Sequence, residues 1–486
     1  MLSLWFPALM AFSVASALRL PFFVETMPRG ADAWYYLLYR RTLRRTRTFP
    51  VHLPQYLLDI PEQWYPPVFP ILFSMIPRSM ESAAVRFLAP TIESLVAGVV
   101  ALLASWKFGP YLGIIAGLLY ATCPASIANS ASLTSRPLGA AVLFAWVMTG
   151  ASLLLAPSWP LILLSVALVA LLLLTHKLST QQMVALTILA MAVNRSVWPA
   201  AMLLGGLGLA VVGSGGFYIK VARGHLDILR FWRRNLVRLG AHQIYDAPWF
   251  RGIPPENAHV YATGTPSSPM VRLFKVLYYY GIFGSAVAAS TWLSGGIGGL
   301  ALAVGGVLLT AAATKAVPQL RFLGEGYKYL GFVGAPGAML IAEVASSSKA
   351  GLWICMFGFG LGAVLSLLDV DRLSSCETLG LPDGAEEAFR TAAAGGPRGV
   401  MVLPTLFADA CTCLTGAPVL WGGHSGGFAR LEPYWPVIHD PMTAPFVDAV
   451  VVCRDYVRLE DLGPIGWDFQ EVYRSACMSV LVRVRK

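Results

Sequence analysis

The fold is decided by the stretch that follows the first apolar segment of the chain, RGADAWYYLLYRRTLRRTRTFP (Arg29–Pro50). It places one carboxylate, Asp32, ahead of a run of aromatic residues and arginines. The apolar segment before it, residues 1–24, is near the length of about 20 residues with which a helix crosses a bilayer. The stretch therefore opens an extramembrane loop with a single acid close to the membrane surface.

The chain is too apolar for a soluble protein of its size. It has 486 residues, of which 56% are hydrophobic and 13% are charged, and its mean hydropathy is +0.62. Soluble domains are about 25% charged. Apolar runs of span length recur up to residue 368 and predict about eleven transmembrane helices. The predicted spans are residues 1–24, 87–106, 109–125, 138–156, 159–175, 181–194, 196–217, 273–293, 297–314, 329–346 and 350–368.

We expect a mainly α fold with two parts, a transmembrane domain over residues 1–368 and a small soluble α/β domain over residues 369–486. The second part is more polar, with one helical piece at Gly384–Ala394 and the β-rich runs VMVLP, APVLW, VDAVVVC and MSVLVRV. The first part has two long predicted loops, residues 25–86 and 218–272. The second of these loops contains a basic amphipathic helix of the kind that lies in the headgroup plane.

The basic residues of the predicted membrane domain gather on one side. With eleven spans, the segments Arg29–Arg86, Lys220–Arg272 and Lys315–Lys328 all fall on the side of the C-terminal domain. The positive-inside rule would make that side cytoplasmic. Arginines that bind phosphate can override the rule, so the sequence leaves the orientation open. Because these residues border apolar spans, we expect the lipid bilayer and no nucleic acid as their partner.

Local pattern gives the opening stretch a structural interpretation. Asp32 follows Gly30 and Ala31 and precedes a helical pattern, which favours Asp32 as a helix N-cap. The arginines of Arg40–Arg47 are expected near lipid phosphates. Further along the loop, Trp64-Tyr65-Pro66-Pro67 predicts a stiff, non-helical corner, because each residue before a proline favours extended backbone.

The order of these features resembles the GT-C superfamily of membrane glycosyltransferases. The resemblance rests on GADAWYYL, the juxtamembrane basic segment and WYPPVFP, followed by SLTSRPLG, LTHK and RFLGEGYKYL before a terminal soluble domain. Its layout covers the whole membrane domain, and its sharpest parts are the first loop and RFLGEGYKYL. The WWDYG motif of oligosaccharyltransferase catalytic subunits does not occur in the sequence, which argues against that branch.

The resemblance implies a reaction and a donor. Members transfer a sugar from a polyprenyl-phosphate or polyprenyl-diphosphate carrier to a glycan, lipid or protein acceptor, usually with inversion, on the extracytoplasmic face. An aspartate in the first loop acts as general base, and by position this is Asp32. Tyr35, Tyr36 and Tyr65 are candidates for stacking on the sugar. A carboxylate suits the base because the acceptor hydroxyl must lose its proton as the new bond forms.

Other residues compete for the same roles. Asp59 and Glu62 are rival bases, although charged loop residues are usually just solvated. The phosphate candidates are His176 and Lys177, which end one span, Arg136 in SLTSRPLG and Arg321 in RFLGEGYKYL, with Arg321 favoured because a guanidinium suits phosphate. The residues Glu325, Tyr327 and Lys328 are expected to shape the sugar pocket.

The sequence predicts no metal and no cofactor. Asp369-Val370-Asp371 spells the DxD motif of nucleotide-sugar transferases, but it ends an apolar span and does not follow a strand. Cys411 and Cys413 lack further ligands at metal-site spacing. A glycine- and aromatic-rich segment with His424 and His439 is either a loop rim or a surface that faces the acceptor.

Two other functions remain open at this point. A transporter or flippase of polyprenyl-linked glycans would place ionisable groups near the bilayer midplane. Here Glu93 and Glu343 are the exceptions within nearly charge-free spans, and the polar residues gather at one face. A non-catalytic membrane subunit would have no need of the Asp32 carboxylate.

Overall fold

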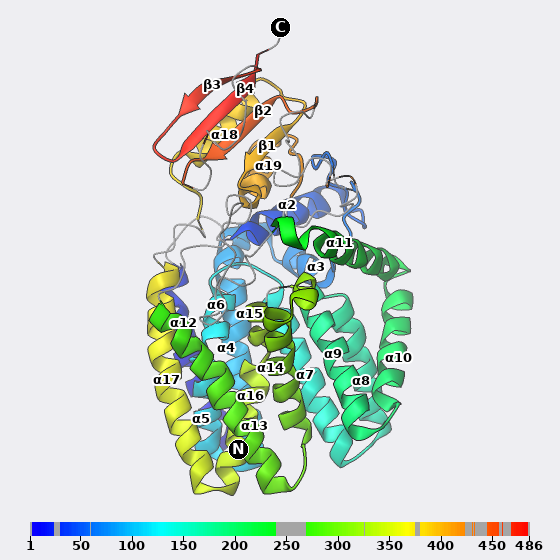
Figure 1. Ribbon diagram of the computed structural model, residues 1–486, viewed down its shortest axis with the longest axis vertical. Coiled ribbons are helices and arrows are strands. Elements are labelled where there is room, and N and C mark those ends of the chain that lie inside the picture. Colours follow the sequence, from blue (N-terminus) through cyan, green and yellow to red (C-terminus); the bar gives the residue numbers. More distant parts are fainter. Residues whose placement is uncertain are drawn as a thin grey trace.

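The computed structural model shows a tall bundle of helices with a small sheet-containing domain at one end (Figure 1). It describes residues 2–23, 30–58, 60–239, 269–324, 326–374, 380–422, 430, 432, 445–455, 459 and 468–484. The N-terminus lies toward the other end of the bundle, and the C-terminus lies beyond the sheet (Figure 1). Asp59, Glu325, His424 and His439 fall outside the described residues.

The bundle is built from long and short helices, most of them apolar. Their bounds are α1 (Leu2–Arg19), α4 (Glu81–Phe108), α5 (Pro110–Ala121), α6 (Pro124–Ser130), α7 (Arg136–Leu155), α8 (Trp159–Leu173), α9 (Lys177–Asn194), α10 (Trp198–Gly213), α12 (Pro269–Val276), α13 (Gly284–Ser294), α14 (Gly299–Ala316), α15 (Gly326–Tyr329), α16 (Gly334–Ser347) and α17 (Lys349–Ser374). A π-helical stretch, Leu277–Phe283, joins α12 to α13. Prolines in the first turn of α5, α6, α7, α8 and α10 set where these helices begin, since that turn needs no N–H donor.

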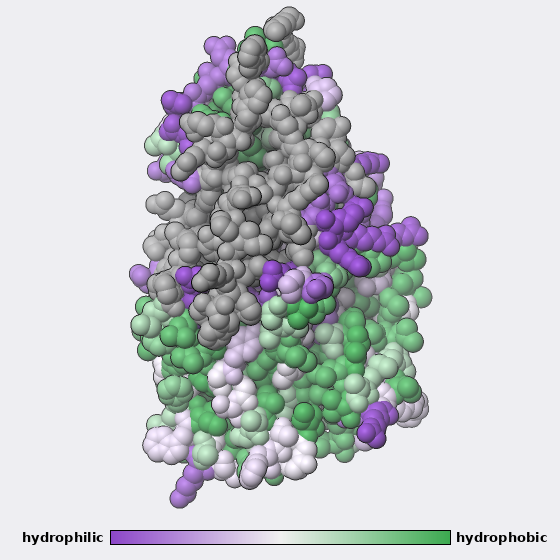
Figure 2. Space-filling model, in the orientation of Figure 1, coloured by the Kyte–Doolittle hydropathy of each residue, from purple (hydrophilic) through white to green (hydrophobic). Residues whose placement is uncertain are grey.

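Much of the bundle surface is apolar. Among the described residues, five helices are long and apolar enough to cross a membrane, and up to eight if each bent helix pair is one span. Figure 2 shows hydrophobic residues over the bundle and hydrophilic residues gathered toward the end that carries the sheet. The mainly helical architecture with a small C-terminal sheet is confirmed, whereas the count of about eleven spans stays a prediction.

Three helices lie between the bundle and the C-terminal domain, namely α2 (Ala31–Thr46), α3 (Val68–Met75) and α11 (Phe217–Leu239) (Figure 1). α11 is bent by 117° from α10 and so runs across the end of the bundle. Ile228 and Phe231 of α11 are buried, while Arg230 and Arg233 are exposed. This division fits a helix that lies along a membrane surface.

The prediction that Arg40–Arg47 form one lipid-facing surface is wrong for its first residue. Arg40 is fully buried, forms an ion pair with Glu81 and donates to the carbonyl oxygen of Ile76 at 2.7 Å. Carbonyls that end α3 and the carboxylate that begins α4 therefore hold this cation inside the protein. Arg41 also pairs with Glu81, at 3.0 Å, but its side chain is exposed.

The C-terminal domain is built on a mixed sheet with the order β1-β2-β4-β3 among the described residues. The strands are β1 (Val400–Leu403), β2 (Ala449–Cys453), β3 (Phe469–Arg474) and β4 (Met478–Arg483), accompanied by α18 (Ala385–Ala394) and α19 (Ala408–Thr415). β1 and β2 are parallel, and the other neighbouring pairs are antiparallel. Three of the predicted runs form β1, β2 and β4, while APVLW forms only isolated bridges at Val419.

The first loop and the C-terminal domain share one hydrophobic core. The backbone N–H of Leu57 donates to Val419 O at 3.0 Å, and that of Leu58 donates to Leu420 O at 3.0 Å. Beside them, the Tyr56 hydroxyl donates to the buried carboxylate of Asp409 at 2.6 Å. The loop is thus an added edge segment of the C-terminal sheet.

Gly224 allows α11 to pack closely against the first loop. A Cβ atom on Gly224 would lie 2.4 Å from the Trp64 ring. We expect Gly224→Ala to lower the free energy of unfolding by about 1–3 kcal/mol through overpacking, although alanine favours helix over glycine by about 1 kcal/mol. Gly208→Ala in α10 is the control, because nothing lies within 4 Å of its Cβ position. Thermal unfolding in detergent measures both, and a stabilised Gly224→Ala protein would contradict the close contact.

Candidate functional site

Asp32 lies in the first turn of α2 and is half-buried. The N-cap of this helix is Gly30, and no side chain makes a capping hydrogen bond there. The interpretation of Asp32 as the N-cap is therefore wrong. Its negative charge still lies at the positive end of the helix dipole, which stabilises the ionised carboxylate.

Four of the predicted residues come together around Asp32. Burial, and then the negative charge of Asp32, raises the pKa of Tyr65 to about 12. Burial lowers the pKa of Lys177 to about 8, against the opposing influence of Asp32, while the charges of Lys328 and Arg136 lower it further. Such mutual influence requires the groups to be near one another. Lys177 thus lies near one carboxylate and two further cations, which come from other segments of the chain.

Helix packing explains why Arg136 and Lys177 are neighbours. Arg136 is the first residue of α7, and Lys177 is the first residue of α9. A Cβ on Gly139, one turn into α7, would lie 2.9 Å from His176 Cβ, so the two first turns touch. Both helices therefore direct their N-terminal N–H groups, as well as a cation, toward the same region, and this arrangement attracts anions.

His176 has a structural position within this pair of turns. It is the N-cap of α9, where its Nδ1 accepts from the Ser179 backbone N–H at 3.4 Å. Its side chain is 2% exposed. Of the predicted pair, Lys177 is the residue on which the charge of Asp32 acts, and His176 caps the helix that carries it.

The predicted tyrosines form a packed layer. Tyr35 and Tyr36 are fully buried, and their ring centroids lie 6.1 and 6.3 Å from that of Tyr65. The Tyr36 hydroxyl hydrogen-bonds the Ser135 hydroxyl at 3.1 Å, next to Arg136 in the chain. Lys177 Nζ lies 5.9 Å from the centroid of the Tyr65 ring, within cation–π range. In the described structure these rings support the charged groups and expose little face for a sugar.

The remaining predicted residues make other contacts. Glu62 forms an ion pair with Lys220 and so ties the loop to α11. Arg321, in the 3₁₀ helix Pro318–Leu323, is half-buried; burial lowers its pKa, and its Nε has no hydrogen-bond partner among the described residues. Tyr327 accepts a hydrogen bond from Lys275 at 3.2 Å. Lys275 in turn pairs with Asp369, the first acid of the DxD sequence, at 3.1 Å.

Sequence reasoning missed a polar chain beside Lys177. Gln181, one turn further along α9, lies 2.8 Å from His225 of α11 through their nitrogens, and it also hydrogen-bonds the Tyr329 hydroxyl. That hydroxyl lies 3.0 Å from the carbonyl oxygen of Leu323. The chain links α9, α11 and the segment RFLGEGYKYL. The only sequence signal was the i, i+4 spacing of Lys177 and Gln181.

Gly30 positions Asp32 against the loop that carries Arg136. Its φ is +83°, and a Cβ on it would lie 2.8 Å from Ser132 Cβ. We expect Gly30→Ala to lower the free energy of unfolding by about 1–3 kcal/mol, since a side chain adds both strain and a clash. Gly109→Ala is a control that also has positive φ, but nothing lies within 4 Å of its Cβ position. Equal losses of stability in the two variants would show that backbone strain acts alone and that the Ser132 contact is unimportant.

No protein-family model and no curated protein sequence matches the chain. Solved structures do match, and they define the class of fold as that of the GT-C glycosyltransferases, as expected from the sequence. The likeness covers nearly the whole chain and shows this fold. The described helices that are long and apolar enough to cross a bilayer fit an integral membrane protein.

Three such structures are similar to this chain at 13% identity. ArnT from Cupriavidus metallidurans, bound to undecaprenyl phosphate, has a TM-score of 0.58 and is covered over 98% of both chains. The Archaeoglobus fulgidus oligosaccharyltransferase in its apo form has a TM-score of 0.56 over 98% of this chain and 74% of its own. The mycobacterial arabinofuranosyltransferase AftD has a TM-score of 0.50 over 99% of this chain and 40% of its own.

Proposed function

We propose that this protein is a membrane glycosyltransferase that moves a sugar from a polyprenyl-phosphate or polyprenyl-diphosphate donor to a glycan, lipid or protein acceptor. The observation that carries the proposal is that Tyr65 and Lys177 both lie within electrostatic range of Asp32 and Arg136, at the end of an apolar bundle. A carboxylate beside cations suits a reaction in which a hydroxyl loses a proton while a phosphate leaves.

The residues can be given roles in an inverting displacement. The acceptor oxygen forms a bond to the anomeric carbon as the bond from that carbon to the carrier phosphate oxygen breaks. Asp32 takes the proton of the acceptor hydroxyl. The carrier phosphate keeps the electron pair of the broken bond, and Lys177, Arg136 and the N-termini of α7 and α9 stabilise its charge.

Two of the similar structures support the donor class. ArnT from Cupriavidus metallidurans was solved with undecaprenyl phosphate, and the archaeal oligosaccharyltransferase AglB with dolichol-phosphate and an inhibitory peptide. Both lipids combine a long isoprenoid chain with a phosphate. The same combination suits a cation group placed at the edge of a lipid-facing bundle.

We place the site and the C-terminal domain on the extracytoplasmic side. The positive-inside rule argues against this orientation if every arginine on that side counts equally. Arg40 and Arg41, however, both pair with Glu81, which offsets one of their two positive charges. An arginine that is buried in an ion pair, as Arg40 is, serves the fold of the loop, and this supports the proposed orientation.

Binding of the carrier tests the proposal. We expect the purified protein to bind polyprenyl phosphate but not the polyprenol of the same length. The double variant Arg136→Gln, Lys177→Met should weaken binding about 100-fold or more, because each bond to a charged group contributes about 1.5–3 kcal/mol. Lys349→Gln is the control, since this exposed lysine begins α17 at the other end of the bundle. Equal binding of phosphate and alcohol would contradict the proposal.

A further inference from the structure

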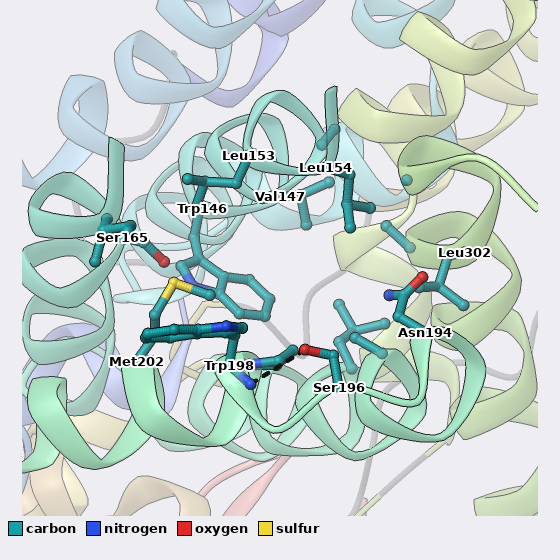
Figure 3. Close-up of a pocket in the computed structure, with 18 of the residues that line it drawn as sticks. Trp146, Val147, Leu153, Leu154, Ser165, Asn194, Ser196, Trp198, Met202 and Leu302 are labelled. Carbon is teal, nitrogen blue, oxygen red and sulfur yellow. Dashed lines mark hydrogen bonds between the residues drawn. The ribbon is translucent and has the colours of Figure 1, made fainter. Parts of the chain in front are cut away.

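A cavity lies far from Asp32, at the opposite end of the bundle. It occupies about 520 Å³ between α7, α8, α9, α10 and α14, near the turns that join α7 to α8 and α9 to α10. Known ligand pockets span about 300–1,000 Å³, so a ligand of ordinary size fits. Its walls are mostly carbon, with Trp146, Leu154, Trp198 and Met202 among the residues around it (Figure 3).

Two hydrogen-bonding groups in this wall lack partners. Ser165 is 1% exposed, and its hydroxyl points toward the cavity from α8 (Figure 3). The Ser165 Oγ and the Trp146 Nε1 are buried without a hydrogen-bond partner among the described residues. The indole N–H can only donate, and the hydroxyl can donate as well. A ligand for this cavity therefore carries acceptor oxygens as well as an apolar chain.

The entrance has the features of a membrane interface. Trp159 and Trp198 are 73% and 63% exposed at the two turns, and such aromatic residues favour the headgroup level. Arg195 lies between Asn194 and Ser196, which both line the cavity. Its side chain is exposed and makes no ion pair with any described residue. A cation at the rim of an apolar cavity complements an anionic headgroup.

We propose that this cavity binds an acyl chain of an anionic glycerophospholipid from the leaflet opposite the Asp32 site. Its phosphate meets Arg195, its ester carbonyls accept from Ser165 and Trp146, and its hydrocarbon fills the apolar walls. Ser165 lies six residues into α8, about 9 Å from Trp159 along the helix, and so sits below the headgroup level where ester groups lie. The proposal does not depend on the glycosyltransferase assignment.

The tail of a polyprenyl carrier fits this cavity less well. An isoprenoid chain has no acceptor oxygen for Ser165 or Trp146. Lys177 and Asn194 stand at opposite ends of α9, so the cavity mouth is about 25 Å from the proposed phosphate site. A carrier held at Lys177 would bring only hydrocarbon to this depth and would leave Arg195 without an anion.

Native mass spectrometry of the full-length protein tests this inference, because it identifies a retained lipid by its mass. The probes are phosphatidylglycerol, phosphatidylcholine with the same acyl chains, and undecaprenyl phosphate. We expect one phosphatidylglycerol on the wild type. Gly150→Phe should lower its occupancy at least tenfold, since Gly150 lines the cavity and nothing lies within 4 Å of its Cβ position. Gly208→Phe, on an exposed face of α10, is the matched control and should retain the lipid.

Two further variants separate the headgroup from the chain. Arg195→Gln should lower phosphatidylglycerol occupancy about fivefold and leave phosphatidylcholine unchanged. Ser165→Ala adds no bulk and should also weaken retention, so the inference stays testable even where Gly150→Phe fails to fold. Three results would overturn it: no retained phosphatidylglycerol, equal loss in the two phenylalanine variants, or selective loss of undecaprenyl phosphate in Gly150→Phe.

Discussion

Replacement of Asp32 by asparagine is expected to lower the rate of sugar transfer by about 10²–10⁴-fold, the usual contribution of a general base. Asparagine keeps the size of the side chain and removes its ability to accept a proton. Because Asp32 is not the N-cap of α2, the substitution leaves the start of that helix intact. Transfer from a polyprenyl-phosphate sugar to an acceptor, measured with the purified protein, gives the rate.

Two comparisons make this result specific. Asp383→Asn, in an exposed acid of the C-terminal domain, should leave the rate unchanged. Polyprenyl-phosphate binding by Asp32→Asn should stay at the wild-type level, since the base acts on the acceptor. Full transfer activity in Asp32→Asn would show that another group is the base. Carrier binding by a wild-type protein that never transfers sugar would favour a flippase.

The second large effect concerns pH. Burial lowers the pKa of Lys177 to about 8, whereas an exposed lysine titrates near 10.4. The cation needed for the phosphate is therefore present below pH 8 and is lost as the pH rises through that value. Since kcat/KM reports the free enzyme, we expect it to fall about 30-fold between pH 7 and pH 9.5.

The variant Lys177→Arg isolates this titration. Arginine stays charged over the whole range, so the decline above pH 8 should disappear even where the absolute rate is lower. Lys177→Met should show a low kcat/KM that does not depend on pH in this window. A decline that persists unchanged in Lys177→Arg would assign the titration to another group.

The position of the charged groups was predictable because membrane spans alternate in direction. Apolar runs of about 20 residues fix which loops share a side, and this placed Asp32, Arg136, Lys177 and Lys328 on one side of the membrane. In the structure, Lys177 lies within electrostatic range of the other three residues. The periodicity of each run carries no information on which helices are lateral neighbours. The contacts of Gln181 with His225 and of Tyr329 with Gln181, which span 44 and 148 residues, could not be predicted for that reason.

Two local errors have a common physical cause. The local pattern predicts Asp32 as a cap and Arg40 as a lipid-facing residue, because pattern rules treat each residue by its own chain neighbours. Gly30 takes the N-cap, since Ser132 lies too close for any side chain there. Arg40 is buried because Glu81 and the end of α3 supply its partners. In both cases a tertiary contact overrides the local preference.

The pairing of the first loop with the C-terminal sheet has a consequence for biosynthesis. Tyr56 and Asp409 are separated by 353 residues. At about 5–20 residues per second, a ribosome needs roughly 20–70 s to make the chain between them. During that time the loop that bears Asp32 has no C-terminal sheet with which to pair. A nascent chain that stalls between Tyr56 and Asp409 would therefore insert its helices in the membrane without forming the core that the first loop shares with the C-terminal domain.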